Sequence, residues 1–316
     1  MLLKNKKVTS LLRCPRSNGL LALADNETTL VVCEDPTRQY KIINGFPIMI
    51  DFAASVFKAS QVSTRREGSA VTRKQYSGLS RLLKRIVAPN KRSTSKNVAT
   101  LRSLLKRTLG ETKRILVVGG GSIGQGMAPL YSDPDLEIVA FDVYGSEHVQ
   151  FVADAHQIPL ADASFDCVIV QAVLEHVLDP HRVVSEIHRV LKIGGLVYSE
   201  TPFLQHVHEG PYDFTRFTDS GHRYLFRAFE LIKSGSSGSA GTQLLWSLDY
   251  FFRSVFRSRF AGKVAKVLFF WVRLFDRAIP PSYSIDAASG NFFLGRKHAG
   301  HKMEPSEIIG YYQGAQ

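Results

Sequence analysis

Residues 114–124 read Arg114-Ile-Leu-Val-Val-Gly-Gly-Gly-Ser-Ile-Gly124 and join an uninterrupted apolar run to a glycine-rich turn. Such a run is typical of a strand buried on both faces of a parallel sheet, because helices cover both of its sides. The glycines leave the backbone open to close approach by a ligand. The stretch therefore indicates an α/β sheet with a ligand site after its first strand.

Further strand and helix signals alternate along the next 80 residues. Apolar runs predict strands over 137–142, 149–153, 165–171 and 195–201. Asp179-Pro180 begins a helix whose apolar side chains recur at helical spacing, and an earlier helix is predicted near 123–131. This alternation is typical of a doubly wound, mostly parallel sheet.

The glycines and an acid predict a nucleoside site. Asp142 ends the second strand about 20 residues after Gly119, Gly121 and Gly124, where a carboxylate can accept both ribose hydroxyls. Nicotinamide dinucleotides and S-adenosylmethionine are both held in this way. The pattern leaves both cofactors open, as well as a tight turn without a ligand.

Three later segments narrow this choice. They read Phe151-Val-Ala-Asp-Ala-His-Gln-Ile-Pro-Leu160, Ser164-Phe-Asp-Cys-Val-Ile-Val-Gln-Ala-Val-Leu-Glu-His176 and Glu186-Ile-His-Arg-Val-Leu-Lys-Ile-Gly-Gly195. Their order and spacing resemble the 11-type family of class I S-adenosylmethionine-dependent methyltransferases. The resemblance implies a seven-stranded Rossmann-like methyltransferase fold, in which 229–233 and 291–297 form the last, antiparallel pair of strands.

The resemblance also implies roles for single residues. Asp154, with Ala155 beside it, matches the acid that bonds the adenine amino group, and Gln171 lies near the methionine end of S-adenosyl-L-methionine. Glu175 and His176 match the family's E-H pair. The alternatives are a solvated loop carboxylate for Asp154 and a purely structural pair for the other two.

Two departures from the family pattern concern the glycine turn. Val117 stands where the family has an acid that helps to hold the methionine part of the cofactor. One extra residue also separates Gly121 from Gly124. A protein that binds the cofactor without turnover therefore stays an alternative.

Residues 206–218 supply the acceptor-side candidates. The stretch His206-Val-His-Glu-Gly-Pro-Tyr-Asp-Phe-Thr-Arg-Phe-Thr218 resembles an H-x-x-P-x-D-x-x-R-x-T segment of some family members. Histidine has a pKa near neutrality and can deprotonate a hydroxyl nucleophile. We predict catalytic roles for His176, His206, His208 and Asp213, with a structural Asp213–Arg216 pair as the alternative, and no metal site.

The first 52 residues form a small module of their own. Cys14, Cys33 and the run over 40–50 resemble a zinc-ribbon-like module that precedes some methyltransferases. A zinc site of that kind needs four ligands, and only two cysteines are present. We therefore expect the fold without the metal, with Asn44-Gly45 as a hairpin turn.

A helical insertion over 240–280 separates the last two strands. It mixes aromatic with basic side chains: Trp246, Tyr250, Phe251, Phe252, Phe256, Phe260, Phe269, Phe270, Trp271 and Phe275 with Arg253, Arg257, Arg259, Lys263, Lys266 and Arg273. Such a helix either covers the sheet as a lid or lies on a membrane surface. The second interpretation gives peripheral membrane contact through 244–275.

The net charge of +12 is concentrated in one segment. Residues 58–114 hold 16 Lys or Arg and two acids, so they carry +14 and leave the rest near −2. Basicity confined to a linker, with runs such as 102–107, is typical of solvated faces. We therefore expect no nucleic-acid partner.

Cysteine usage and hydropathy suggest the compartment. Three cysteines do not make a disulfide framework, and residues 1–7 lack the apolar segment of a secretory signal. The most apolar stretch, 264–275, is short and contains two basic residues. We expect a cytoplasmic protein without a spanning helix, in contact with the inner face of a membrane if the insertion binds lipid.

The sequence thus predicts four regions: a module over 1–52, a basic linker or helical segment over 53–112, a methyltransferase domain over 113–298 and a tail over 299–316. The leading hypothesis is transfer of a methyl group from S-adenosyl-L-methionine to a small or lipid-linked acceptor, most simply at oxygen. A nicotinamide-dependent oxidoreductase is the alternative from another class. It explains the glycines and Asp142 but not the segment over 186–195.

Overall fold

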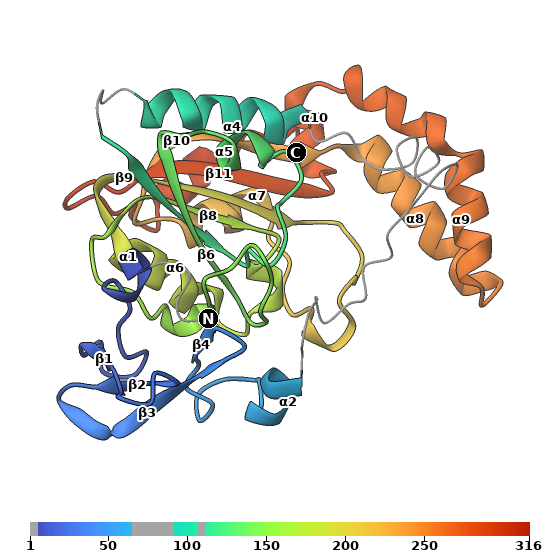
Figure 1. Ribbon diagram of the computed structural model, residues 1–316. Helices are drawn as coiled ribbons and strands as arrows, with labels where there is room; N and C mark the ends of the chain where they lie inside the picture. Colours follow the sequence, from blue (N-terminus) through green and yellow to red (C-terminus); the bar gives the residue numbers. More distant parts are fainter. Residues whose placement is uncertain (1–5, 65–91, 107–110) are drawn as a thin grey trace.

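The computed structural model describes residues 6–64, 92–106 and 111–316. Its strands are β1 (Leu21–Leu23), β2 (Thr29–Val32), β3 (Asp35–Ile43), β4 (Phe46–Met49), β5 (Lys113–Val118), β6 (Leu136–Asp142), β7 (Phe151–Ala153), β8 (Phe165–Gln171), β9 (Leu191–Pro202), β10 (Glu230–Gly238) and β11 (Gly290–Arg296). They form one sheet in the order β1-β2-β3-β4-β7-β6-β5-β8-β9-β11-β10 (Figure 1).

The α-helices are α1 (Lys6–Thr9), α2 (Ala59–Thr64), α4 (Arg92–Leu105), α5 (Ala128–Tyr131), α6 (Pro180–Val190), α7 (Asp219–Leu225), α8 (Ala240–Val255), α9 (Arg259–Leu268), α10 (Pro281–Asp286) and α11 (Glu307–Tyr311). The 3-10 helices among the described residues are η1 (Ala155–Gln157), η2 (Leu174–His176), η3 (Gly210–Tyr212) and η4 (Phe270–Arg277).

Seven neighbouring strands of the sheet, in the order β7-β6-β5-β8-β9-β11-β10, confirm the predicted methyltransferase fold. The strands β7, β6, β5, β8 and β9 pair in parallel. Beyond β9, the strand β11 lies between β9 and β10 and pairs with both of them antiparallel. The helix predicted near 123–131 is reduced to α5, because the turn after the glycines continues as far as Met127, the residue that precedes α5.

Helices cover both faces of the central sheet and explain its continuous apolar runs. Alternate side chains of β5 point to opposite faces, so Ile115 packs with α4 and α5 while Leu116 packs with α6 and α7. Asp179 caps α6 by accepting a hydrogen bond from the Arg182 amide, as its sequence predicted.

The helix α4 ties the described part of the basic segment to the sheet. Arg102 and Lys106 form ion pairs with the buried Asp133, and Thr94 donates a hydrogen bond to the carboxylate of Glu200. The apolar face of α4, including Leu101, lies in the core. Of the segment predicted as a basic linker, residues 65–91 and 107–110 lie outside the described residues.

The N-terminal strands form an antiparallel meander that joins the central sheet. Asn44 and Gly45, both with positive φ, make the predicted hairpin turn between β3 and β4. The strand β4 then pairs in parallel with β7. Cys14 is buried, with its Sγ 3.2 Å from Tyr40 Oη, whereas Cys33 is exposed. The likeness to a zinc ribbon stays a prediction.

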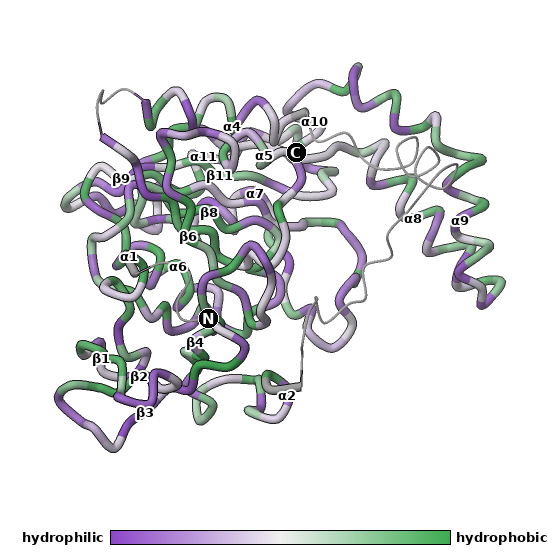
Figure 2. Tube along the Cα trace, viewed as in Figure 1, coloured by the Kyte–Doolittle hydropathy of each residue, from purple (hydrophilic) through white to green (hydrophobic). Residues whose placement is uncertain are grey.

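The helices α8 and α9 pack on each other and project beyond the edge of the sheet (Figure 1). This arrangement differs from a lid that covers the sheet. Figure 2 shows apolar residues along both helices. Within the described ranges, no helix combines the length and apolar character needed to cross a bilayer.

The burial of α4 gives a prediction about stability. Leu101→Ala should lower the free energy of unfolding by about 2–5 kcal/mol, because it leaves a cavity between α4 and the sheet. Lys96→Ala, on the exposed side of the same helix, should change it by less than about 0.5 kcal/mol. Urea denaturation followed by circular dichroism measures both, and equal stabilities would contradict the packing of α4.

A second prediction concerns pH. Burial lowers the pKa of His222 to about 3, against about 6.5 in an unfolded chain. Between these values the unfolded chain binds a proton that the folded chain does not. The free energy of unfolding is therefore highest above about pH 6.5. It falls by up to about 1.4 kcal/mol for each pH unit below that value. His222→Phe should remove this dependence, as measured by urea denaturation at pH 7 and pH 5. Parallel pH profiles of the two proteins would refute the assignment.

Candidate active site

A cleft opens at the carboxyl edge of the sheet, beside the junction of β5 and β8. The chain leaves β5 toward α5 on one face and leaves β8 toward α6 on the other. This is a topological switch point, where open α/β sheets bind their ligands. The cleft is lined by Val56, Phe57, Val118, Gly119, Ser122, Phe141, Asp142, Val143, Tyr144, Ala153, Asp154, Ala155, His156, Ala172, Val173, His176, Val177, Glu209 and Tyr212.

Gly119 forms the floor of the cleft directly after β5. Its φ of +71° is unfavourable for a residue with a side chain. A Cβ at this position would also lie 2.3 Å from Cγ2 of Val173, which follows β8. Only glycine therefore satisfies both the backbone and its neighbour.

Asp142 is held in position by the glycine turn. Its Oδ2 accepts a 2.8 Å hydrogen bond from the Gly121 amide, and its Oδ1 accepts one from the Val143 amide. A Cβ on Gly121 would meet Asp142 Oδ2 at 2.7 Å and Tyr144 Oη at 2.3 Å. The carboxylate is thus fixed at the end of β6, where the sequence placed a ribose partner.

Asp154 follows β7, the neighbour of β6, so the two acids share one edge of the sheet. The carboxylate accepts hydrogen bonds from His156 and from the hydroxyl of Ser55. His156 Nε2 accepts from the Asp179 amide, which leaves Nδ1 as the donor to Asp154. Burial raises the pKa of Asp154, but these hydrogen bonds outweigh burial and lower it below its usual value.

An N-terminal segment borders the cleft, which the sequence did not predict. Val56 and Phe57 line it together with Tyr212 of η3. The rings of Phe57 and Tyr212 stack with centroids 5.8 Å apart. Residues more than 150 positions apart thus meet at one wall. The aromatic character of Phe57 and Tyr212 was visible in the sequence, but their pairing was not.

Three of the predicted cofactor residues do not line the cleft: Gly121, Gly124 and Gln171. Gly124 and Gln171 line a neighbouring hollow, together with Val117. Gln171 donates a hydrogen bond to the carboxylate of Glu200, which also accepts one from Tyr198. The structure brings Gly119, Asp142, Asp154, Ala155 and His176 together in the main cleft.

Two of the predicted acceptor-side residues, His208 and Asp213, meet His176 at the end of the cleft near η2. His208 lies against His176, with ring centroids 4.9 Å apart. Asp213 pairs with Arg216 and accepts a hydrogen bond from the His208 amide. Burial raises the pKa of Asp213, but these partners lower it to about 2.

His206 is turned toward the insertion rather than toward the cleft. Its ring stacks on Tyr250 of α8, with centroids 4.3 Å apart and an interplanar angle of 11°. The hydroxyl of Tyr250 also donates to the carbonyl of Val207. This arrangement links α8 to the acceptor-side segment.

Comparisons with known proteins agree with this geometry. Residues 130–199 match the family model described as a methyltransferase domain. The demethylmenaquinone methyltransferase of Renibacterium salmoninarum is 35% identical over 138 residues, 40% of this chain and 54% of that protein. That of Clavibacter sepedonicus is 34% identical over 89 residues, 28% of this chain and 35% of that protein. The matches thus span about half or less of the length of these curated relatives.

Among solved structures, phosphoethanolamine N-methyltransferase 2 of Haemonchus contortus, in complex with S-adenosyl-L-methionine, is also similar. The identity is 18%, the alignment covers 69% of this chain and 56% of that chain, and the TM-score is 0.43.

Residues 130–199 therefore match a methyltransferase domain, and S-adenosylmethionine is the cofactor of that class of domain. The donor set of the cleft fits the cofactor. Asp142 offers a carboxylate for ribose hydroxyls, and Asp154 offers one for an adenine amino group. Gly119 has no side chain, so the cofactor can approach its main chain closely. Phe141 and Val173 add apolar surface for a flat base.

Gly119→Ala tests this floor of the cleft. The methyl group should displace Val173 and strain the backbone, so we expect a lower melting temperature and at least tenfold weaker binding of S-adenosylmethionine. Gly310→Ala is the control, because a Cβ there meets nothing within 4 Å. Differential scanning calorimetry and isothermal titration measure the two effects. An unchanged Gly119→Ala protein would contradict the close contact.

Proposed function

We propose that the whole protein transfers a methyl group from S-adenosylmethionine to a hydroxyl of a small or lipid-linked acceptor. The observation that carries this proposal is the pair of acids, Asp142 and Asp154, at the ends of adjacent strands beside the bare main chain of Gly119. A nucleoside is the ligand that such a set of donors suits.

The cofactor, when bound, supplies a methyl group already activated by a sulfonium. Asp142 and Gly121 would orient its ribose, Asp154 and Ala155 its adenine, and the wall formed by Phe57 and Tyr212 would exclude water. Positioning in line supplies much of the rate in such a transfer, so a catalytic triad is not required.

The acceptor end lies at His176 and His208. In O-methylation the acceptor oxygen forms a bond to the methyl carbon as the carbon–sulfur bond breaks, and the electron pair stays on sulfur. The hydroxyl must lose its proton, and the two imidazoles are the groups placed to promote that loss. The names of the two bacterial relatives support a lipid-linked acceptor.

Isothermal titration with S-adenosylmethionine tests the cofactor assignment. Asp142→Ala should weaken binding at least tenfold, because charge-assisted hydrogen bonds to the ribose are lost. Asp25→Ala, at an exposed turn, should bind as the wild type does. The absence of heat and of a thermal shift with the wild type would sink the proposal. Quenching of Trp246 or Trp271 by NADH would instead favour the oxidoreductase.

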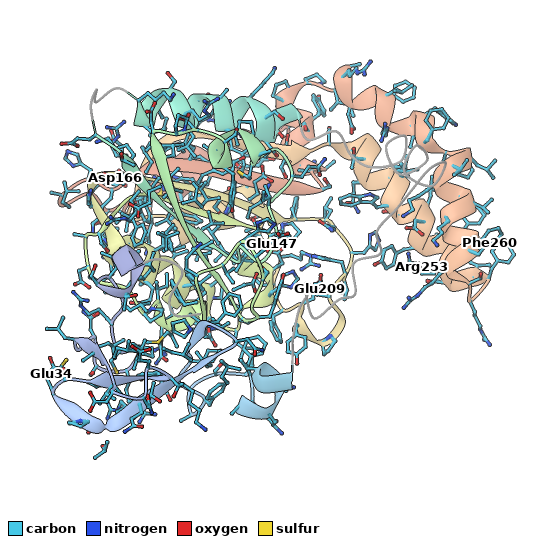
Figure 3. The ribbon with its side chains drawn as sticks, in the orientation of Figure 1. Glu34, Glu147, Asp166, Glu209, Arg253 and Phe260 are labelled. Carbon is cyan, nitrogen blue, oxygen red and sulfur yellow. The ribbon has the colours of Figure 1, made fainter. Side chains whose placement is uncertain are left out.

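The insertion provides a specific observation in favour of membrane contact. Apolar side chains over 251–275, in α8, α9, η4 and the turn after α8, are exposed: Phe251, Val255, Phe256, Phe260, Val264, Val267, Leu268, Trp271, Leu274 and Phe275. Exposed cations lie among them: Arg257, Arg259, Lys263 and Arg277. Arg253 and Phe260 mark this region in Figure 3. Apolar side chains mixed with cations suit the surface of an anionic bilayer.

Vesicle sedimentation tests this contact. Wild type should bind phosphatidylglycerol-containing vesicles more tightly than pure phosphatidylcholine vesicles, and less tightly as salt is raised. The double variant Phe256→Ser, Phe260→Ser should bind at least tenfold more weakly, since two exposed rings no longer enter the interface. Ile309→Ser removes an equally exposed apolar side chain from α11 as a control. Equal binding by both variants would argue against the insertion as the membrane contact.

A further inference from the structure

Glu175, His176 and His208 form a compact cluster at the acceptor end of the cleft. One ligand atom from each of the three residues lies within 4.8 Å of the other two. Nε2 of His176 is 3.7 Å from Oε1 of Glu175, and Nε2 of His208 is 3.9 Å from the same oxygen. The Glu175 side chain is 1% exposed, and the imidazoles are 21% and 28% exposed, so the cluster has a buried side and an accessible side.

The tautomer of each imidazole follows from its other nitrogen. Nδ1 of His176 is 2.7 Å from the carbonyl oxygen of Tyr212, which can only accept, so Nδ1 carries the proton. Nδ1 of His208 is 3.2 Å from Oδ2 of Asp213 and 3.4 Å from the carbonyl oxygen of His206, so it is protonated as well. In a neutral ring Nε2 is therefore the nitrogen with a lone pair, and this atom lies 3.7 Å from Glu175 Oε1 in His176 and 3.9 Å from it in His208.

Three electron-pair donors thus converge on one point. Two imidazole nitrogens and one carboxylate oxygen are donor atoms that a divalent cation of the zinc class takes. The nearby guanidinium of Arg216 pairs with Asp213, donates to the carbonyl of Gln205 and also interacts electrostatically with Glu175.

We propose that Glu175, His176 and His208 bind a divalent transition-metal ion of the zinc class through Oε1 and the two Nε2 atoms. Two imidazoles and one carboxylate make the ligand set of many catalytic zinc sites, with the fourth position left for water or substrate. Ligands around a tetrahedral zinc ion stand about 3.3 Å apart, so the two distances to Glu175 need to close by only about 0.4–0.6 Å.

The groups that accept hydrogen bonds from the two histidine ligands are of the kind found in known metal sites. Histidine ligands usually donate their other N–H to a carboxylate or a backbone carbonyl, which fixes the tautomer and raises the basicity of the ligating nitrogen. Asp213 does this for His208, and the Tyr212 carbonyl does it for His176. The Glu175 carbonyl also accepts a hydrogen bond from the Phe214 amide, which holds the two ligand-bearing segments together.

The role of the ion rests on the proposed methyltransferase function. His176 lines the cofactor cleft, so the open position of the ion would face the acceptor. A metal ion there would act as a Lewis acid that lowers the pKa of the acceptor hydroxyl and releases its proton to water. The imidazoles would then be ligands rather than the general base.

Metal titration of the full-length, tag-free protein tests the site without any methyl acceptor. After treatment with EDTA, wild type should bind one Zn²⁺ per chain in isothermal titration, and Co²⁺ should give visible absorption bands of a four-coordinate ion. Glu175→Gln and His208→Ala should each weaken Zn²⁺ binding at least tenfold, and Asp213→Asn should weaken it about 10–100-fold. His298→Ala, which removes an exposed histidine elsewhere, should leave the affinity unchanged.

Two outcomes overturn the site: no stoichiometric Zn²⁺ binding by wild type, or equal affinity of wild type and His208→Ala. The His208 ring is partly exposed, so His208→Ala decides the question even if Glu175→Gln fails to fold, and circular dichroism reports folding. Titration with S-adenosylmethionine is separate. Zn²⁺ binding without cofactor binding would refute the proposed function alone, and cofactor binding without Zn²⁺ binding would refute the metal site alone.

Discussion

The close approach of β5 and β8 at their carboxyl ends determines the rest of the site. Val118 pairs with Val170, and the chain then turns at Gly119 under the side chain of Val173. Because no other residue fits this contact, the two connections can separate toward opposite faces of the sheet and leave a crevice between them. Asp142 and Asp154 border that crevice because their strands continue the same parallel edge.

Segments distant in sequence complete the cleft that the sheet begins. Ser55 holds Asp154, and Phe57 stacks on Tyr212, so residues of the N-terminal part and of the segment after β9 share one wall. The N-terminal meander also adds strands to the central sheet through β4. Residues 55–57 and residues of the methyltransferase domain therefore form the candidate cofactor site together.

The acceptor end is connected to the projecting insertion. Tyr250 of α8 stacks on His206 and bonds the Val207 carbonyl, directly before His208. A surface suited to an anionic bilayer and a cluster suited to a metal ion thus lie on two sides of one short segment. If the acceptor is lipid-linked, this arrangement would bring its polar end from the membrane to the cleft.

The sequence by itself determined where the parallel strands lie along the chain and which acids follow them, because buried parallel strands leave uninterrupted apolar runs whose ends are marked by Gly119, Asp142 and Asp154. It could not show that His206 faces α8, that Gln171 bonds Glu200, or that His208 meets Glu175. Those contacts join residues 29–44 positions apart without periodic spacing. Strand register places Gln171 beside Glu200, and the packing of the segments between strands brings the other two pairs together. Phe57 and Tyr212, still farther apart, were brought together for the same reason.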